Sequence, residues 1–460
     1  MALCPAAKPA AGGQHWYICL SAIKLCNYCL VLRLNPYMTN DLITLDLTGM
    51  AHGGSAIGRH EGRAIFVPYG IPGEQVQVRI VQDKGRFAIA ELVEVLVPSS
   101  NRVEPPCPYF GAGQCGGCQF QFIDYANQLT LKHQIVRDQL ARIGALPEVI
   151  VHPTIPSPMP YGYRSHATFH VAPNKQLGFI KTDHRTVVPV DECLLLSPIL
   201  SGVFEEAHTQ KFTSDARIRL QAGSDNQVIQ FTMGSIIDDV TEPLLEKPAL
   251  RPNQKQNTRK PANTPTTAPE SPDKPFGSDV YYQIKERLFR CSAGSFFQVN
   301  LVQAEKLVDL VLERLNLSGD EHVLDLYSGV GLFTAFLAAH SAQVAAVEFF
   351  APAVADARHN LSDQTNVEFH MGKIETILPK FKNDYQAAVV DPPRAGMDAS
   401  ALDALINIKP HQIVYVSCDP ATLARDAKRL TGAGYILQDV QPVDMFPQTY
   451  HIECVAHFVR

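Results

Sequence analysis

His322-Val-Leu-Asp-Leu-Tyr-Ser-Gly-Val-Gly-Leu-Phe-Thr334 is the stretch that most clearly indicates the fold of this chain. An apolar strand ends on an acid, a glycine turn follows and a helix begins, as at the opening of a nucleotide-type βαβ unit. The turn contains Gly329 and Gly331 but lacks the third glycine of the dinucleotide fingerprint. The stretch therefore predicts an α/β domain with an incomplete dinucleotide motif.

Three further predicted strands end on side chains suited to binding or catalysis, namely Glu348, Asp391 and Cys418. Glu348 lies nineteen positions after Gly329, where an acid can bind a ribose diol. We expect four successive β/α units that bring these three residues and Asp325 to one edge of a parallel sheet. Ligands bind at the carboxyl edge of such sheets.

Cys418 lies in Gln412-Ile-Val-Tyr-Val-Ser-Cys418-Asp-Pro420, between an apolar strand and a helix-like segment. A lone cysteine is more often a buried structural thiol. The strand-end position and the adjoining Asp-Pro instead favour exposure to a site, where a thiolate can act as a nucleophile.

Length and charge limit the class of protein. The 460 residues are enough for two to four domains, and a hydrophobic fraction of 46% allows ordinary cores. No run of eighteen apolar residues occurs, so we expect a soluble, cytoplasmic protein without a membrane span. The net charge of -6 requires any RNA binding to come from local patches and shape.

The N-terminal part changes character at Met38. Residues 1–37 show no clear period, and we expect translation to start at Met38 with the leader absent or disordered. From Asp41 to Val97, four alternating runs separated by Gly-rich or Pro-Gly turns predict a small closed β-barrel.

A group of cysteines follows the predicted barrel. Cys107, Cys115 and Cys118 lie on a Gly-rich segment, and Cys193 can supply a fourth thiolate. Glycines cost backbone entropy unless they allow a tight turn, so the pattern favours ligation over free thiols. The residues alone permit a structural zinc site or an iron–sulfur cluster.

The centre of the chain mixes predicted helices and strands. Apolar spacing predicts helices over 124–143 and 302–315, and alternation predicts strands over 161–171, 177–180, 186–190, 216–220 and 227–231. Residues 246–278 are rich in Pro, Thr, Asn and Lys, and we expect a disordered insertion there.

Four motifs together resemble the RNA uracil-C5 methyltransferase family. They are Asp325-Leu-Tyr-Ser-Gly-Val-Gly331, Asp391-Pro-Pro-Arg-Ala-Gly396, Val416-Ser-Cys-Asp-Pro-Ala-Thr-Leu-Ala-Arg-Asp426 and Asp444-Met-Phe-Pro-Gln-Thr-Tyr-His-Ile-Glu453. The barrel, with its motifs at 49–58 and 67–74, resembles the RNA-binding, OB-like TRAM domain. The layout is most similar to bacterial 23S rRNA (uracil-5-)-methyltransferases that carry a [4Fe–4S] cluster. The gap between Cys107 and Cys115 is longer than is usual in that family.

The resemblance implies a fold, a reaction and the roles of ten residues. It implies a C-terminal Rossmann-like domain that uses S-adenosyl-L-methionine, with Cys418 as nucleophile and Glu453 as base. The cofactor would be held by Gln298, Tyr327, Glu348 and Asp391, and the cluster by Cys107, Cys115, Cys118 and Cys193.

These expectations divide the chain into a leader (1–37), a TRAM barrel (38–97), an α+β middle domain (98–294) and a methyltransferase domain (295–460). We expect a monomer that acts on RNA, most specifically 23S rRNA. Methylation of uracil in tRNA or of cytosine C5 in RNA, and a non-catalytic RNA-binding role, remain alternatives.

Overall fold

The computed structural model describes residues 42–460 except 184, 208–211, 213–215, 225, 234–278 and 382–383. The expected leader at 1–37 and the expected insertion at 246–278 lie outside the described residues. All the elements named below belong to one compact unit, residues 42–460.

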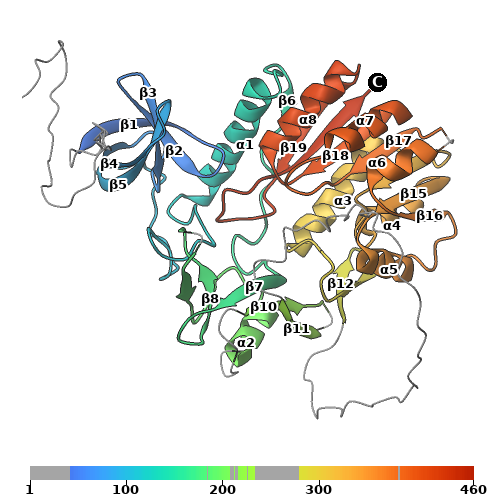
Figure 1. Cartoon of the computed structure of the whole chain (residues 1–460), viewed down its shortest axis with the longest axis horizontal. Coiled ribbons are helices and arrows are strands. Elements are labelled where there is room, and N and C mark those ends of the chain that lie inside the picture. Colours follow the sequence, from blue (N-terminus) through green and yellow to red (C-terminus); the bar gives the residue numbers. More distant parts are fainter. Residues whose placement is uncertain are drawn as a thin grey trace, which may run out of the picture. The chain divides into compact units, whose positions relative to one another are not determined.

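The predicted barrel is confirmed. It closes in the order β1-β2-β3-β5-β4, and its strands are β1 (Ile43–Met50), β2 (Ser55–His60), β3 (Arg63–Pro68), β4 (Gln75–Asp83) and β5 (Phe87–Val97) (Figure 1). Alternate residues such as Leu45 and Leu47 are buried inside it. The sequence did not predict β2, because the glycine-rich residues before it are typical of a turn.

The central segment, residues 98–294, contains one long helix and a five-stranded sheet. The helix is α1 (Tyr125–Arg142), capped by Asp124, whose carboxylate accepts from the N–H of Ala126. The sheet has the order β11-β10-β7-β8-β9. Its elements, with the adjoining helix, are β7 (His166–Val171), β8 (Leu177–Ile180), β9 (Val187–Pro189), α2 (Pro198–Ala207), β10 (Arg217–Ala222) and β11 (Val228–Met233). The strand expected from Tyr161 begins only at His166, because the residues before it form bends.

A hairpin that the sequence did not predict follows, formed by β12 (Asp279–Ile284) and β13 (Arg287–Ser292). After it, α3 (Leu301–Leu315) confirms the helix expected over 302–315. Asn300 caps this helix by accepting from the N–H of Gln303.

The C-terminal part is built on an eight-stranded sheet of order β16-β15-β14-β17-β18-β20-β19-β6. Its strands are β14 (His322–Leu326), β15 (Gln343–Glu348), β16 (Val367–Met371), β17 (Ala387–Val390), β18 (Gln412–Ser417), β19 (Ile436–Val443), β20 (Glu453–Val459) and β6 (Ile150–Val151). The helices are α4 (Leu332–Ala338), α5 (Ala351–Asn360), α6 (Ile374–Ile377), α7 (Ala399–Ile408) and α8 (Pro420–Gly432) (Figure 1).

The strands β14 to β18 are parallel neighbours, which confirms the predicted α/β fold. The four expected units are not successive, because β16 lies between β15 and β17 in the chain. The strand order reverses between β14 and β17, and a doubly wound sheet opens a ligand crevice at such a reversal. Asp325 and Asp391 lie at the ends of these two strands.

The central segment also takes part in the C-terminal sheet. Its short strand β6 pairs in parallel with β19, and α1 packs against α8. No helix in the described part of the chain has the length and apolarity needed to cross a membrane.

Candidate active site

The turn after β14 leaves open space at the end of the sheet. Tyr327 has a φ of 64°, and its N–H donates to the carbonyl of Val347 at 3.0 Å. A Cβ placed on Gly329 would meet no atom within 4 Å. The chain turns into α4 at Gly331, whose φ is 90°. The turn thus provides an uncrowded stretch of backbone where a nucleotide-like ligand can bind.

Glu348, at the end of β15, is held by backbone amides. Its Oε2 accepts from the N–H of Gly329 at 3.0 Å, and its Oε1 accepts from Phe349 at 2.8 Å and Phe350 at 2.7 Å. A carboxylate has about four lone-pair positions, so capacity remains for a further donor such as a ribose hydroxyl. The half-buried side chain is therefore oriented in advance.

Two acids lie at the reversal of the strand order. Burial raises the pKa of Asp325 to about 7. Burial, and then the charge of Asp325, raises the pKa of Asp391 to about 7. The Oδ2 of Asp325 accepts from Thr334 at 2.5 Å, while its buried Oδ1 has no hydrogen-bond partner among the described residues. Buried polar atoms are normally paired, so Oδ1 is fitted to accept from a ligand. The sequence placed Asp325 at this edge without assigning it to the cofactor.

Cys418 occupies the turn between β18 and α8. The carboxylate of Asp419 caps α8 by accepting from the N–H groups of Ala421 at 2.9 Å and Thr422 at 3.0 Å, and Pro420 starts the helix. This sharp turn leaves Cys418 half-buried, whereas Cys454 on the next strand is fully buried. Cys418 is thus partly exposed at the end of the strand, and its role in a site stays a prediction.

Glu453 starts β20 beside this turn. Ser417 pairs with Cys454, so Glu453 lies just beyond the end of β18, next to Cys418. Burial, and then the charges of Glu453 and Asp391, raises the pKa of Cys418 to about 12. Burial and the charge of Asp391 also raise the pKa of Glu453 well above its usual range. The predicted nucleophile and base are therefore electrostatic neighbours in a desolvated site.

Arg394 supplies positive charge to the same site. It follows β17. Its positive charge partly offsets the rise in the pKa values of Cys418 and Glu453. Its Nη2 lies 2.9 Å from Nε2 of His451. Burial and then Arg394 lower the pKa of His451 to about 3, so the neutral imidazole accepts from the guanidinium. The sequence assigned a role to neither residue, although both lie inside the family-like motifs.

Gln298 is buried two residues before the cap of α3. Within the described residues, no hydrogen bond joins it to the other predicted cofactor residues. The structure therefore places Tyr327, Glu348 and Asp391 at one edge of the sheet but does not link Gln298 to them.

The four predicted cluster cysteines are neighbours around a glycine-rich loop. Burial, with smaller contributions from the charges of Cys193 and Cys107, raises the pKa of Cys115 to about 11. Burial is the main cause that raises the pKa of Cys118 to about 12, and Cys193 adds to it. In the described ranges, however, no group of three or more His, Cys, Asp or Glu residues is arranged to hold a metal ion. Metal binding by these thiols stays a prediction.

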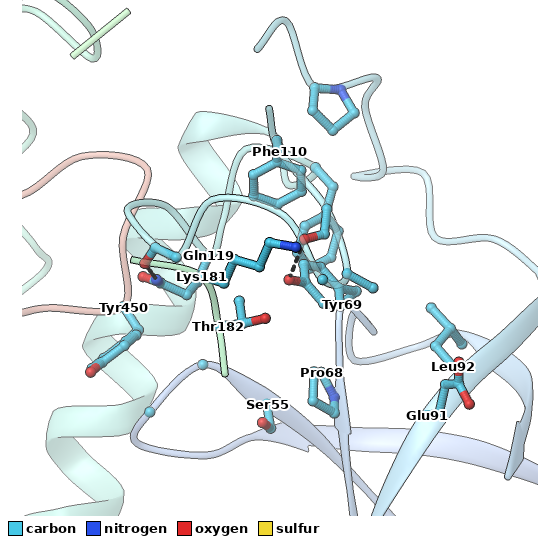
Figure 2. Close-up of a pocket in the computed structure, with 18 of the residues that line it drawn as sticks. Ser55, Pro68, Tyr69, Glu91, Leu92, Phe110, Gln119, Lys181, Thr182 and Tyr450 are labelled. Carbon is cyan, nitrogen blue, oxygen red and sulfur yellow. Dashed lines mark hydrogen bonds between the residues drawn. The ribbon is translucent and has the colours of Figure 1, made fainter. Parts of the chain in front are cut away.

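A cavity of about 1090 Å³ lies apart from the predicted catalytic residues. It is lined by the barrel, the cysteine loop, the end of β8 and Tyr450. Figure 2 shows Lys181 extending between Tyr450 on one side and Tyr69 and Phe110 on the other. The hydroxyl of Tyr69 donates to the carbonyl of Gly111 at 2.9 Å and so ties the barrel to the cysteine loop.

The barrel also approaches the Cys418 turn. The Nε2 of His52, between β1 and β2, lies 3.5 Å from Oδ2 of Asp419. A Cβ on the nearby Gly54 would lie 3.0 Å from Cβ of Tyr450, so only a small residue fits at this contact. The barrel loop is therefore adjacent to the segment that leads to Glu453.

Comparisons with known proteins agree with this arrangement. The family model described as tRNA (Uracil-5-)-methyltransferase matches residues 279–460, and the TRAM domain model matches residues 38–93. An uncharacterized RNA methyltransferase of Bacillus cereus is 35% identical over 448 residues, which cover 92% of this chain and 97% of the relative. Another, of Gloeobacter violaceus, is 33% identical over 445 residues, covering 91% and 96%.

A solved structure shares the fold. The tRNA (uracil-54, C5)-methyltransferase of Pyrococcus abyssi, in complex with S-adenosyl-L-homocysteine, matches with a TM-score of 0.66 and 24% identity, covering 92% of this chain and 100% of that one. The family resemblance of the motifs and of the barrel is thus confirmed. The chain belongs to the S-adenosylmethionine-dependent RNA (uracil-5-)-methyltransferase family.

Proposed function

We propose that this enzyme methylates C5 of a uridine in 23S rRNA through a covalent bond between Cys418 and C6 of the base. The observation that carries the proposal is the neighbourhood of an accessible thiol, a buried carboxyl and a guanidinium at one sheet edge. A role confined to RNA binding would not require Cys418 and Glu453 to lie together.

The chemistry assigns a separate step to each group. C5 of uracil is a poor nucleophile until a thiolate adds to C6, which leaves an enolate with electron density on C5. Bound S-adenosylmethionine supplies the electrophilic methyl group. Glu453 then takes the proton from C5, and the bond between Cys418 and C6 breaks to return the thiolate.

The protonation states of Cys418 and Glu453 must change when the substrates bind. With its pKa raised to about 12, Cys418 is a thiol near neutral pH and must lose a proton before it attacks. Arg394 opposes this rise, so we propose that its guanidinium stabilises the thiolate. Glu453 must be ionised when the C5 proton is removed, and the same guanidinium favours that state.

We further propose that Tyr327, Glu348 and Asp391, together with Gln298, hold the cofactor. Support comes from the remaining acceptor capacity of Glu348 and from the open backbone at Gly329. The unpartnered oxygen of Asp325 adds an acceptor at the same edge.

The four cysteines at 107, 115, 118 and 193 are proposed to ligate a [4Fe–4S] cluster. Their soft thiolate donor set suits iron–sulfur binding, and the charge of Arg164 lowers the pKa values of Cys115, Cys118 and Cys193, which favours the ligating form. By the family resemblance of the sequence, such a cluster supports the 23S rRNA branch, and tRNA stays the alternative because a tRNA (uracil-54, C5)-methyltransferase covers 92% of this chain. Cytoplasmic location and a monomeric state stay predictions.

The deciding experiment supplies labelled S-adenosylmethionine with 23S rRNA or tRNA and identifies the methylated nucleoside. We expect 5-methyluridine in 23S rRNA, no product with Cys418→Ala, and near-normal product with the matched control Cys291→Ala, whose thiol lies buried in the β12–β13 hairpin. Product in tRNA alone would move the proposal to the tRNA branch, and 5-methylcytidine would refute the base assignment.

A further inference from the structure

The loop 444–452 joins β19 to β20 and leads into Glu453. Gln448, in the middle of this loop, has a φ of 68°. This left-handed conformation is unfavourable for a residue with a Cβ and persists only where the surroundings enforce it. The contacts of Gln448 therefore decide the direction in which the chain continues to Glu453.

Residues 119–128 hold Gln448 through four hydrogen bonds. Its carbonyl oxygen accepts from the N–H groups of Gln119 and Phe120, both at 3.0 Å. Its own N–H donates to Oε1 of Gln128 at 3.2 Å, and its Oε1 accepts from Nε2 of Gln128 at 3.0 Å. Gln128 and Gln448 are both buried, so water does not readily replace these hydrogen bonds.

The amide of Gln128 is itself fixed in orientation. Its Nε2 also lies 3.1 Å from the carbonyl oxygen of Phe120 and 2.9 Å from that of Ile123, so its two hydrogens are shared among three acceptors. All three partners of Nε2 are oxygen atoms, and the partner of Oε1 is an N–H group. The amide is thus oriented by its network and presents an acceptor to the backbone of Gln448.

The chain enters the reaction centre within three residues of Gln448. The N–H of His451 donates to Oγ1 of Thr449 at 3.2 Å, and its ring meets Arg394. Glu453 follows beside Cys418. Relaxation of Gln448 to a negative φ would redirect His451 and Glu453 together.

A separate anchor holds the start of the loop. The Nζ of Lys132 donates to Oδ1 of Asp444 at 2.6 Å, and Nε2 of Gln303 donates to the carbonyl of Asp444 at 3.0 Å. Removal of the Gln128 amide therefore leaves this end attached and takes away two of the four hydrogen bonds that hold Gln448.

We propose that Gln128 is a positioning residue for the methyl-transfer site. It holds Gln448 in the left-handed conformation and thereby aims His451 at Arg394 and Glu453 at Cys418. The segment that contains Cys118 supplies the adjoining amides of Gln119 and Phe120, so the cysteine loop and the catalytic loop are held together. The role of Glu453 in this inference rests on the proposed function.

The first test needs no substrate and uses Gln128→Leu in the full chain. Hydrogen exchange of the amides at 449–453 should accelerate about tenfold or more, because buried hydrogen bonds are lost, while exchange at 444–446 stays unchanged. Gln221→Leu is the matched control, since Gln221 is also fully buried but lies in β10. Unchanged exchange at 449–453 would overturn the inference.

The second test measures the role of this conformation in catalysis. Gln128→Leu should lower kcat about a hundredfold, as expected for a misplaced catalytic group, with the KM for RNA within about twofold. A methylated protein–RNA adduct should accumulate because C5 proton removal slows. Gln448→Gly in the Gln128→Leu background should restore much of the rate, since glycine adopts a positive φ without a Cβ.

Two results would contradict the inference. If Gln221→Leu and Gln128→Leu lose the same thermal stability, an equal loss of kcat in both would reduce Gln128 to a structural role. Failure of Gln448→Gly to restore any rate would show that its conformation is not what Gln128 controls. The exchange result stands whatever RNA is methylated, so a wrong substrate or base assignment is distinguishable from a wrong role for Gln128.

Discussion

Asp325→Asn should make the protein less sensitive to rising pH. The carboxyl of Asp325 is fully buried, and one of its oxygens has no hydrogen-bond partner in the part of the chain that the structure describes. Because burial raises its pKa, the folded state keeps this proton at pH values where the unfolded chain has lost it. Folding stability therefore falls as pH rises through this window.

The size of the effect follows from the two pKa values. The pKa rises from 3.8 to about 7. At roughly 1.36 kcal/mol for each pKa unit, the wild type loses up to about 4 kcal/mol of stability from this group between pH 4 and 7. Asparagine cannot ionise and keeps nearly the same shape, so Asp325→Asn should avoid this loss. Asp391 titrates in the same range, and because the charge of Asp325 contributes to its raised pKa, Asp325→Asn should reduce the loss from Asp391 as well, in the same direction.

Urea unfolding of both proteins at pH 5 and pH 8, without cofactor, measures the difference. The free energy of unfolding of Asp325→Asn relative to wild type should be more favourable at pH 8 than at pH 5, by up to about 3 kcal/mol. Asp320→Asn, at an exposed site, is the control and should show no such change. An unchanged difference between the two pH values would refute a desolvated carboxyl at the cofactor edge.

Three further results are expected. Glu453→Gln should accumulate a denaturation-resistant protein–RNA adduct that carries the transferred methyl, whereas Cys418→Ala should form none, as a denaturing gel would show. Normal turnover by Glu453→Gln would rule out Glu453 as the base. Lys132→Met should destabilise the protein by about 3–5 kcal/mol in urea unfolding, because it leaves the fully buried Asp444 carboxylate without its cation, and Lys132→Met/Asp444→Asn should recover part of the loss. Protein purified without oxygen should contain about four irons per chain, and stoichiometric zinc instead would refute the cluster.

The sequence predicted the features that depend on regular strand geometry. Asp325, Glu348, Asp391 and Cys418 follow parallel neighbouring strands, and parallel strands end at a common edge. The sequence prediction did not include the strand β16, although Val367-Glu-Phe-His-Met371 alternates apolar and polar residues as a strand does; none of these residues is fully buried. The β12–β13 hairpin was missed because Lys285 and Glu286, at its turn, do not carry a typical Asn-Gly or Asp-Gly signal.

The features that the sequence could not predict depend on contacts between distant residues. No local pattern marks a glutamine with a φ of 68°, because such a conformation is imposed by its neighbours in space. The pairing of Arg394 with His451 likewise joins two segments 57 residues apart. The family-like motifs include both segments but do not indicate which of their side chains are in contact.

The most distant of these contacts join the central segment to the C-terminal part of the chain. Gln128 and Gln448 are 320 residues apart, and Lys132 and Asp444 are 312 apart, yet each pair is buried. With β6 paired to β19, they make α1 and its flanking residues part of the methyltransferase architecture. A substitution in α1 can therefore alter catalysis without touching RNA or cofactor. Loss of activity in a variant of the central segment is consequently not proof of RNA contact unless RNA binding is measured separately.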